Sequence, residues 1–152
     1  MRIALGSDEV TALTDDLVAA LREGGHEVEL YGPPAGGAEE WVAASAAAAR
    51  AVAEGRADRG IVCCWSGTGA SIAANKVPGV RAALCADAQT AKMARRYNHA
   101  NVLALSLRVT SPPMGREIVA AFLAEPDGAD DFDLRNVAAL GAMERPGPEP
   151  GY

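Results

Sequence analysis

Short hydrophobic runs rich in β-branched residues alternate along the chain with longer segments in which hydrophobic residues recur at helical spacing. This alternation is typical of parallel strands joined by crossover helices. Strands are predicted at residues 2–5, 26–31, 60–64, 80–85 and 101–105. Because the connecting helices cover both sides of such a sheet, the pattern predicts an α/β fold with a doubly wound, five-stranded parallel sheet in three layers.

Helices are predicted from hydrophobic spacing and from the residues that begin and end each segment. Leu13, Leu17 and Leu21 fall on one helical face before a glycine pair, and Ser111 followed by a proline is typical of a helix start. Arg95 is expected, with Arg96, on a solvated helical face. After the first helix, the predicted helices cover residues 38–54, 70–76, 88–97, 112–124 and 133–143.

The chain has 152 residues, 49% of them hydrophobic and 22% charged, which suits one globular domain of ordinary size. That domain is expected to span residues 1–144. Residues 145–152 are rich in proline and glycine and cannot bury a core, so they are expected to form a flexible C-terminal tail.

The formal net charge of −6 argues against a surface that binds nucleic acid or an anionic membrane. No hydrophobic run approaches the roughly 20 residues that span a bilayer. The first residues lead directly into a predicted strand rather than into a signal peptide, so a cytoplasmic location is expected. Neither a nucleic acid nor a membrane is therefore an expected partner.

Cys63, Cys64 and Cys85 show no spacing typical of zinc ligands or of a secreted disulfide framework, so reduced thiols and no metal are expected. Neighbouring strand residues point to opposite faces, and only Cys64, nearer the end of its strand, can reach the edge of the sheet. Beside a helix N-terminus its thiolate is favoured, which makes Cys64 the candidate base or nucleophile. The alternative is a buried, unreactive thiol.

Ligands of doubly wound sheets bind outside the carboxyl ends of the strands. Residues 6–9, 64–69 and 86–87 follow three predicted strands at that edge. There Asp8 is expected to accept hydrogen bonds from substrate hydroxyls, the alternative being a helix cap, and its neighbour Glu9 is a weaker candidate. Residues 98–101 precede the fifth strand at the opposite edge, a placement that suits a loop serving a neighbouring subunit.

The segment from Ser66 to Ser71 joins a strand to a helix and is rich in small residues. Its backbone N–H groups can bind an anion or an oxyanion at a helix N-terminus; the alternative is a tight turn that only connects two elements. The segment lacks the lysine of a nucleotide-triphosphate loop, the third glycine of a dinucleotide fingerprint, and the glycine that stands two residues before a hydrolase serine.

Several motifs in colinear order resemble the family of ribose-5-phosphate isomerase B and the galactose-6-phosphate isomerase subunits. The resemblance spans roughly residues 1–140. The most specific part is the block from Ser71 to Cys85. The matching motifs are Gly6-Ser7-Asp8, Cys64 with Gly67 and Gly69, Ser71-Ile-Ala-Ala-Asn-Lys-Val-Pro-Gly-Val-Arg-Ala-Ala-Leu-Cys85, and Asn98-x-x-Asn-Val-Leu-Ala-Leu105.

The resemblance implies a flavodoxin-like fold and a cofactor-independent aldose–ketose isomerase that works as a homodimer or a larger oligomer such as a tetramer, with active sites between subunits. In this family a cysteine at the Cys64 position moves a proton between C1 and C2 of the sugar through a cis-enediolate. A second branch uses a glutamate at the position of Ala70, so the chain fits the cysteine branch. The glycine turn is implied to hold the enediolate oxygens, with Ser66 and Thr68 assigned to catalysis, Gly67 and Gly69 to substrate binding, and Asn98 contributed by the partner subunit.

The chain departs from the family pattern at two histidine positions. The histidine that follows the aspartate in the family is Glu9 here. The histidine that opens the sugar ring in the family is Tyr97. Both replacements fall on residues implied to contact substrate, so ring opening by an imidazole is not expected at these positions.

A second set of departures concerns the phosphate. The arginines that hold it in the family appear as Phe132 and Asn136, which leaves Arg135 close by as a candidate. Trp65 replaces a glycine beside the base, where it narrows the pocket or offers a face on which a sugar ring can stack. The chain thus lacks cationic and imidazole groups of the family pattern but keeps the turn that is implied in proton transfer. This combination predicts that it isomerises a sugar different from the family's sugar phosphates, and an unphosphorylated sugar is among the candidates.

Two other functions stay open at this point. One is a catalytically silent sugar-binding or regulatory protein that has kept the fold. The other is a nucleotide-binding module of flavodoxin type, which lacks support because no base-stacking or ribose-binding signature accompanies the glycine turn.

Overall fold

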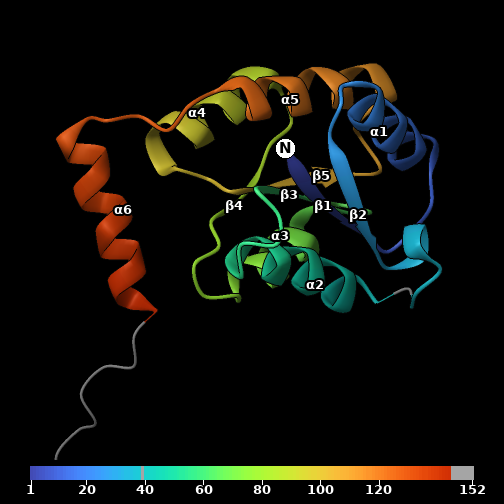
Figure 1. Ribbon diagram of the computed structural model, residues 1–152, viewed down its shortest axis with the longest axis horizontal. Coiled ribbons are helices and arrows are strands. Elements are labelled where there is room, and N and C mark those ends of the chain that lie inside the picture. Colours follow the sequence, from blue (N-terminus) through green and yellow to red (C-terminus); the bar gives the residue numbers. More distant parts are fainter. Residues whose placement is uncertain (39, 145–152) are drawn as a thin grey trace, which may run out of the picture.

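The computed structural model describes residues 1–38 and 40–144, which form three layers (Figure 1). The central layer is a parallel sheet in the order β2-β1-β3-β5-β4. This confirms the predicted doubly wound, flavodoxin-like α/β architecture, with β5 placed between β3 and the edge strand β4. The strands are β1 (Arg2–Ser7), β2 (Glu27–Tyr31), β3 (Arg59–Cys64), β4 (Ala82–Leu84) and β5 (Val102–Ser106).

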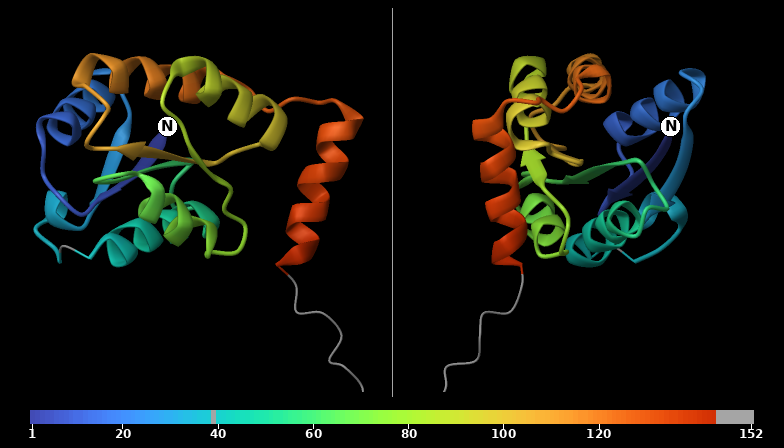
Figure 2. Two further views of the ribbon diagram at one scale, coloured as in Figure 1. Left: turned by 180° about the vertical axis from the view of Figure 1, so that it is seen from behind. Right: turned by 60° about the vertical axis from the view of Figure 1, so that its left-hand side comes forward.

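Helices cover both faces of the sheet, as Figures 1 and 2 show. One face carries α1 (Ala12–Glu23), α4 (Ala88–Asn98) and α5 (Pro112–Ala124). The other carries α2 (Trp41–Ala53) and α3 (Thr68–Asn75), with a short 3₁₀ turn, η1 (Pro33–Ala35), before α2. The last helix, α6 (Asp131–Met143), runs past the outer edge of the molecule beside α4.

Most predicted boundaries differ from the observed ones by one or two residues, and three larger or more informative differences have local reasons. The strand predicted at 80–85 is shortened to β4, because the preceding turn forms hydrogen bonds up to Val80. The helix predicted at 38–54 begins at Trp41, after Glu40 takes the N-cap position. The helix predicted at 70–76 begins at Thr68, because Gly67 adopts a left-handed conformation that turns the chain directly into the first helical turn.

Side chains of β3 alternate between the two cores. Ile61 and Cys63 pack in the core shared with α1, α4 and α5, whereas Val62 and Cys64 pack in the core shared with α2 and α3. The predicted opposite orientation of the two cysteines is therefore confirmed. The second core is built largely from alanines, which lets helix and sheet approach closely.

Arg95 does not lie on a solvated face, so that prediction is wrong; its neighbour Arg96 is exposed as expected. The Arg95 side chain is buried, with only 2% of the residue exposed. Its guanidinium donates to the carbonyl of Ala100 at 2.6 Å and pairs with Asp127 at 2.8 Å. Arg95 is buried by a tertiary contact, because the last turn of α4 packs against the segment that follows α5. Helical spacing alone carries no information about that contact.

No residue of α6 is buried within the chain. The helix is tied to the domain through its preceding segment and through Glu144, whose carboxylate accepts a hydrogen bond from the Gly79 N–H at 2.9 Å. A groove of about 460 Å³ separates it from β4. The predicted tail at 145–152 lies outside the described residues. Among the helices of the described ranges, none has the length and hydrophobicity needed to cross a bilayer.

Candidate active site

The carboxyl ends of β1 and β3 meet at a cavity of about 300 Å³. This is the edge at which doubly wound sheets bind ligands. The cavity brings together side chains from the β1 end, from the turn after β3 and from the first turn of α2. Its lining residues are Asp8, Trp41, Cys64, Trp65, Ser66 and Gly69.

Cys64 is the last residue of β3, and its side chain lines the cavity although only 5% of the residue is exposed. Its sulfur accepts a hydrogen bond from the backbone N–H of Ala70, with an N–S distance of 3.3 Å. Ala70 lies in the first turn of α3, so the sulfur sits at the positive end of that helix. A negative charge on this sulfur is therefore stabilised by a hydrogen bond and by a helix dipole together.

The other two thiols lie in a different environment. Burial raises the pKa of Cys63 to about 12, with smaller contributions from the charges of Cys64 and Asp8. Burial also raises the pKa of Cys85 to about 11, helped by Asp87. Both stay protonated near neutral pH and both belong to the core opposite Cys64. Their expected inert role agrees with this placement.

The turn after β3 requires glycine at one position. Gly67 has φ +75°, and a Cβ there would lie 2.6 Å from the Leu84 side chain and 2.9 Å from the backbone of Leu105. Its N–H donates to the carbonyl of Cys64 at 3.1 Å, so this amide is not free for a substrate oxygen. The expectation that Gly67 supplies an oxyanion donor is therefore wrong: the turn needs that hydrogen bond to close.

Two other amides of the turn suit an oxyanion. The N–H groups of Ser66 and Gly69 have no acceptor among the described residues, whereas the Thr68 N–H lies 3.3 Å from the Ser66 hydroxyl oxygen. Ser66 and Gly69 also line the cavity. Of the backbone N–H groups predicted to bind an anion, those of Ser66 and Gly69 are therefore the two available donors, and both residues line the same cavity as Cys64.

Asp8 follows β1 and faces the cavity. Its Oδ1 is buried and has no hydrogen-bond partner among the described residues, and burial raises the pKa of the carboxyl, helped by the charge of Glu9. The alternative role as a helix cap is wrong, because Thr11 caps α1 through Thr14. An unpartnered buried carboxylate oxygen is suited to accept a hydrogen bond from a ligand hydroxyl.

Two tryptophans flank the cavity, and sequence reasoning found only one of them. Trp65 is 58% exposed, and its carbonyl accepts hydrogen bonds from Ser106 at 2.9 Å and from the Arg108 N–H at 3.0 Å. Trp41 is 43% exposed, and its ring lies 3.0 Å from the position that a Cβ on Gly69 would occupy. The sequence signal for Trp41 is its position near the start of the helix that follows the second strand. In a parallel sheet such a helix begins at the carboxyl edge, where the cavity lies.

Arg108 is a second residue that sequence reasoning missed. It stands just after β5, and its backbone bond to Trp65 fixes an exposed cation at the same edge of the sheet. The signal for Arg108 is its position just after the fifth predicted strand, at the carboxyl edge where doubly wound sheets bind ligands.

Three predicted substrate residues do not lie at this cavity. Tyr97 and Asn98 end α4, before the amino end of β5, and Arg135 lies on α6. Within one chain these residues are at the opposite edge or outside the sheet. Glu9 follows Asp8 but does not line the cavity, and its carbonyl accepts a hydrogen bond from the Ser7 hydroxyl at 2.8 Å.

Comparison with known proteins gives a consistent result. The family model described as ribose/galactose isomerase matches residues 3–138. The chain is 39% identical over 146 residues to ribose-5-phosphate isomerase B of Escherichia coli, covering 95% of this chain and 97% of that protein. It is 37% identical to the D-erythrulose-4-phosphate isomerase of Pectobacterium atrosepticum, with 84% and 86% covered. The solved structure of Clostridium thermocellum ribose-5-phosphate isomerase B superposes with a TM-score of 0.88 at 37% identity, covering 95% and 97%.

Proposed function

Because the chain belongs to the ribose/galactose isomerase family, we propose that it is an aldose–ketose isomerase that acts on a sugar or sugar phosphate with Cys64 as the base. The observation that carries the proposal is the contact between the Cys64 sulfur and the Ala70 N–H at the wall of the cavity. A base is needed because the reaction removes a proton from carbon next to a carbonyl group.

The proposed reaction moves one carbon-bound proton and one hydroxyl proton. The Cys64 thiolate takes the proton from C2 of the open-chain aldose, the C–H electron pair forms the C1–C2 double bond, and the carbonyl pair moves to O1. After the O2 hydroxyl proton passes to O1, the Cys64 thiol returns its proton to C1 and the ketose forms. The thiolate is regenerated, so no cofactor is consumed.

The charge on the enediolate oxygens is the main cost of this reaction. The free N–H groups of Ser66 and Gly69 are placed to donate to them, and each well-aligned donor is worth about 3 kcal/mol. Asp8 would accept a hydrogen bond from a substrate hydroxyl through its unpartnered oxygen. The exposed rings of Trp41 and Trp65 offer apolar surface to the C–H face of a sugar.

We further propose that the substrate differs from those named for the relatives, with an unphosphorylated sugar as the first candidate. Two indole rings flank a small cavity that also carries a buried carboxylate, Asp8. Arg108 is exposed at this edge, whereas Arg135 lies on α6, away from the cavity of its own chain. On α6 the family pattern has further arginines at the positions of Phe132 and Asn136.

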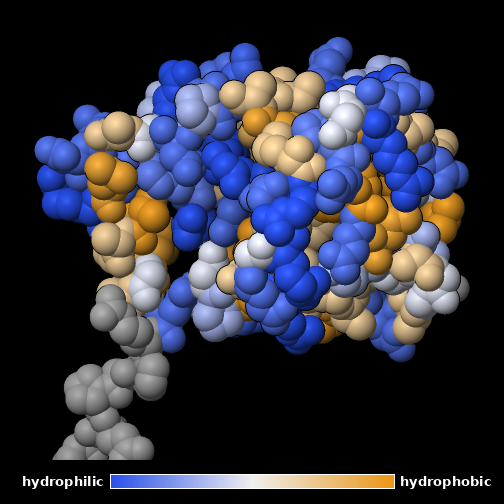
Figure 3. Space-filling view, in the orientation of Figure 1, coloured by the Kyte–Doolittle hydropathy of each residue, from blue (hydrophilic) through white to orange (hydrophobic). Residues whose placement is uncertain are grey.

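We propose that the protein works as a dimer or a larger oligomer with sites shared between subunits. Its support is α6, whose described residues are all unburied and which exposes hydrophobic side chains, visible over this helix in Figure 3. A second copy packed against α6 would bury these hydrophobic side chains. It would also allow Tyr97, Asn98 and Arg135 to complete the partner's cavity. The exposed hydrophobic residues of α6 are Phe132, Leu134, Leu140 and Met143. The cytoplasmic location expected from the sequence stays a prediction.

A panel of substrates tests the function. Ribose 5-phosphate, erythrulose 4-phosphate, galactose 6-phosphate and the corresponding free sugars are assayed with the wild type and with two matched variants, Cys64→Ala and Cys63→Ala. We expect Cys64→Ala to lower kcat by about 10²–10⁴-fold and Cys63→Ala to change it little. Higher kcat/KM with phosphorylated than with free sugars contradicts the substrate proposal. Binding without turnover of any sugar supports the silent sugar-binding alternative.

A further inference from the structure

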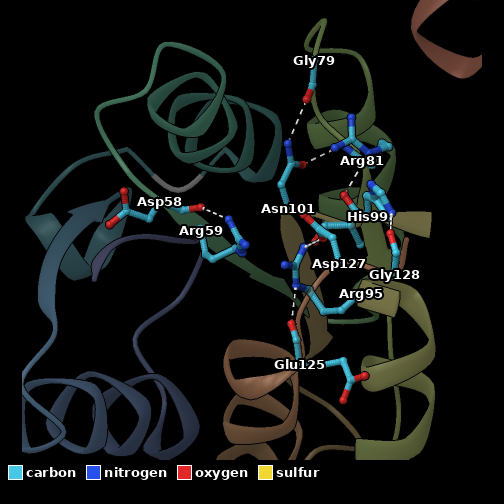
Figure 4. Close-up of polar contacts among 11 residues, drawn as sticks. Asp58, Arg59, Gly79, Arg81, Arg95, His99, Asn101, Glu125, Asp127 and Gly128 are labelled. Carbon is cyan, nitrogen blue, oxygen red and sulfur yellow. Dashed lines mark hydrogen bonds and ion pairs between the residues drawn. The ribbon is translucent and has the colours of Figure 1, made fainter. Parts of the chain in front are cut away.

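Polar and cationic residues gather at the amino ends of β3, β4 and β5, the edge of the sheet opposite Cys64 (Figure 4). Arg59 begins β3 and Cys64 ends it, so the two lie about 16 Å apart along the strand. The isomerase proposal places Tyr97 and Asn98, just before β5, in a partner's cavity, but it uses none of Arg59, Arg81 and Arg95. The edge therefore raises a separate question about what it binds.

The strand register explains why these side chains meet. Gly60 pairs with Val102, and Val102 pairs with Ala82. The residues one step earlier therefore stand in a row, with Asn101 between Arg59 and Arg81. Backbone bonds tie this row together, from Gly60 N–H to the Asn101 carbonyl and from Asn101 N–H to the Arg81 carbonyl, each at 3.0 Å. Neighbouring parallel strands are about 4.8 Å apart, which places the two arginine backbones roughly 10 Å from each other.

All members of the row share one face of the sheet. Arg59 is two residues before Ile61, and Arg81 is two residues before Ala83; both of these hydrophobic residues belong to the core covered by α1, α4 and α5. Buried Arg95 of α4 lies on the same face. In Figure 4 the guanidinium of Arg59 points from β3 toward Arg95 and Asn101. Arg59, Arg81 and Arg95 thus come from three elements on one face of the sheet, with Arg81 beside His99 and on the other side of Asn101 from Arg59.

The carboxylates near this cluster are already engaged. Asp58 accepts two hydrogen bonds from Arg2 at 2.7 Å, and Glu125 pairs with Arg96. Asp127 pairs with Arg95 at 2.8 Å. The Glu144 carboxylate is bound to the N–H of Gly79.

The two arginines of the row have no such partner. Among the described residues, neither Arg59 nor Arg81 forms an ion pair. Their recorded bonds go to backbone carbonyls: Arg59 donates to Asp58, and Arg81 Nε donates to His99 at 2.9 Å. The pKa of Arg95 is lowered, first by its burial and then by the charge of Arg59, with a further contribution from Arg81. Positive charge is therefore in local excess.

We propose that Arg59 and Arg81, backed by Arg95, form a binding site for a phosphate group, separate from the isomerase cavity. A guanidinium matches the geometry of a phosphoryl oxygen pair, and long arginine side chains on backbones at this spacing can reach one dianion from two sides. The group is either free inorganic phosphate or the phosphoryl group of a small metabolite. This inference does not depend on the proposed isomerase activity, because it uses arginines to which the isomerase proposal gives no role.

The test is an NMR titration of ¹⁵N-labelled full-length protein with inorganic phosphate and, separately, with glycerol 2-phosphate, at constant ionic strength. We expect saturable shifts of the amides of Gly60, Arg81 and Asn101. Arg59→Gln should weaken binding by about tenfold or more, because it removes one charge-assisted contact. Arg50→Gln removes the same charge from an exposed position on α2 and should leave the affinity within about twofold. Tighter binding of the ester identifies a metabolite, and equal binding identifies phosphate alone.

Two results would overturn the proposal. One is equal weakening by Arg59→Gln and Arg50→Gln, which would mean general charge screening. The other is a set of shifts confined to residues 64–70 and abolished by Arg108→Gln, which would place the anion at the isomerase cavity. Arg59→Lys, which keeps the charge, should recover part of the affinity, and the amide spectrum itself reports whether each variant is folded.

Discussion

Cys64 is distinguished from its neighbour Cys63 by the direction of one side chain. Both residues end the same strand, yet one sulfur meets a helix N-terminus at a cavity and the other is enclosed in the core. Strand alternation made this difference predictable from the sequence. Trp41 was not predictable in the same way, because its ring reaches the cavity only through the packing of α2 against the turn at Gly69.

The different environments of the thiols predict selective alkylation. Near pH 8, iodoacetamide should modify Cys64 alone in the folded protein, because the raised pKa values of Cys63, about 12, and Cys85, about 11, keep those thiols protonated and unreactive. Mass spectrometry of the folded and the urea-unfolded protein gives the number of alkylated cysteines per chain. One label in the folded state and three after unfolding are expected; a label on Cys63 or Cys85 before unfolding would contradict the assigned environments.

At the scale of elements, the hydrophobic pattern predicted each strand and each α-helix of the described residues, and the errors lie at their ends and at the 3₁₀ turn η1, which was expected as a loop. The ends depend on side-chain contacts that a pattern does not show. Asn75, in the block from Ser71 to Cys85, binds the backbone of Ala82 twice: it accepts from the Ala82 N–H at 2.8 Å and donates to the Ala82 carbonyl at 2.9 Å. This motif residue positions the edge strand β4 within the chain.

The role of Asn75 can be measured as stability. Asn75→Ala removes both bonds to Ala82, and we expect the free energy of unfolding in urea to fall by about 1–2 kcal/mol. Asn136→Ala is the matched control, because that amide donates to one carbonyl of its own helix, at Phe132. Equal stabilities of the two variants would show that Asn75 does not anchor β4.

For the whole molecule, the sequence predicted the fold class and the edge of the sheet that carries the cavity, but a single chain does not gather every predicted site residue. Tyr97, Asn98 and Arg135 lie away from Cys64, and α6 leaves its hydrophobic residues uncovered. The burial of Arg95 was likewise not predictable from the sequence pattern, because Arg95 pairs with Asp127, which lies more than 30 residues further along the chain. Contacts between distant segments and between copies are the part that sequence patterns leave undetermined.

The assembly is tested by changing α6. Phe132→Glu combined with Leu140→Glu places charges on the exposed hydrophobic residues, and we expect light scattering to report a monomer whose circular dichroism is unchanged. Isomerase activity should fall with the loss of the partner's contribution. The control pair Asp131→Lys and Asp133→Lys, in the first turn of the same helix, should leave the oligomer intact. A monomeric wild type, or an unchanged oligomer in the Glu variant, would contradict the shared site.

The most direct test of the proton-transfer role is deuterium incorporation. A substrate found by the panel is incubated in heavy water, and NMR follows the label at C1 of the ketose and C2 of the aldose. The wild type and Cys63→Ala should exchange protons at these carbons, and Cys64→Ala should not. Exchange by Cys64→Ala at the wild-type rate would show that another group removes the proton.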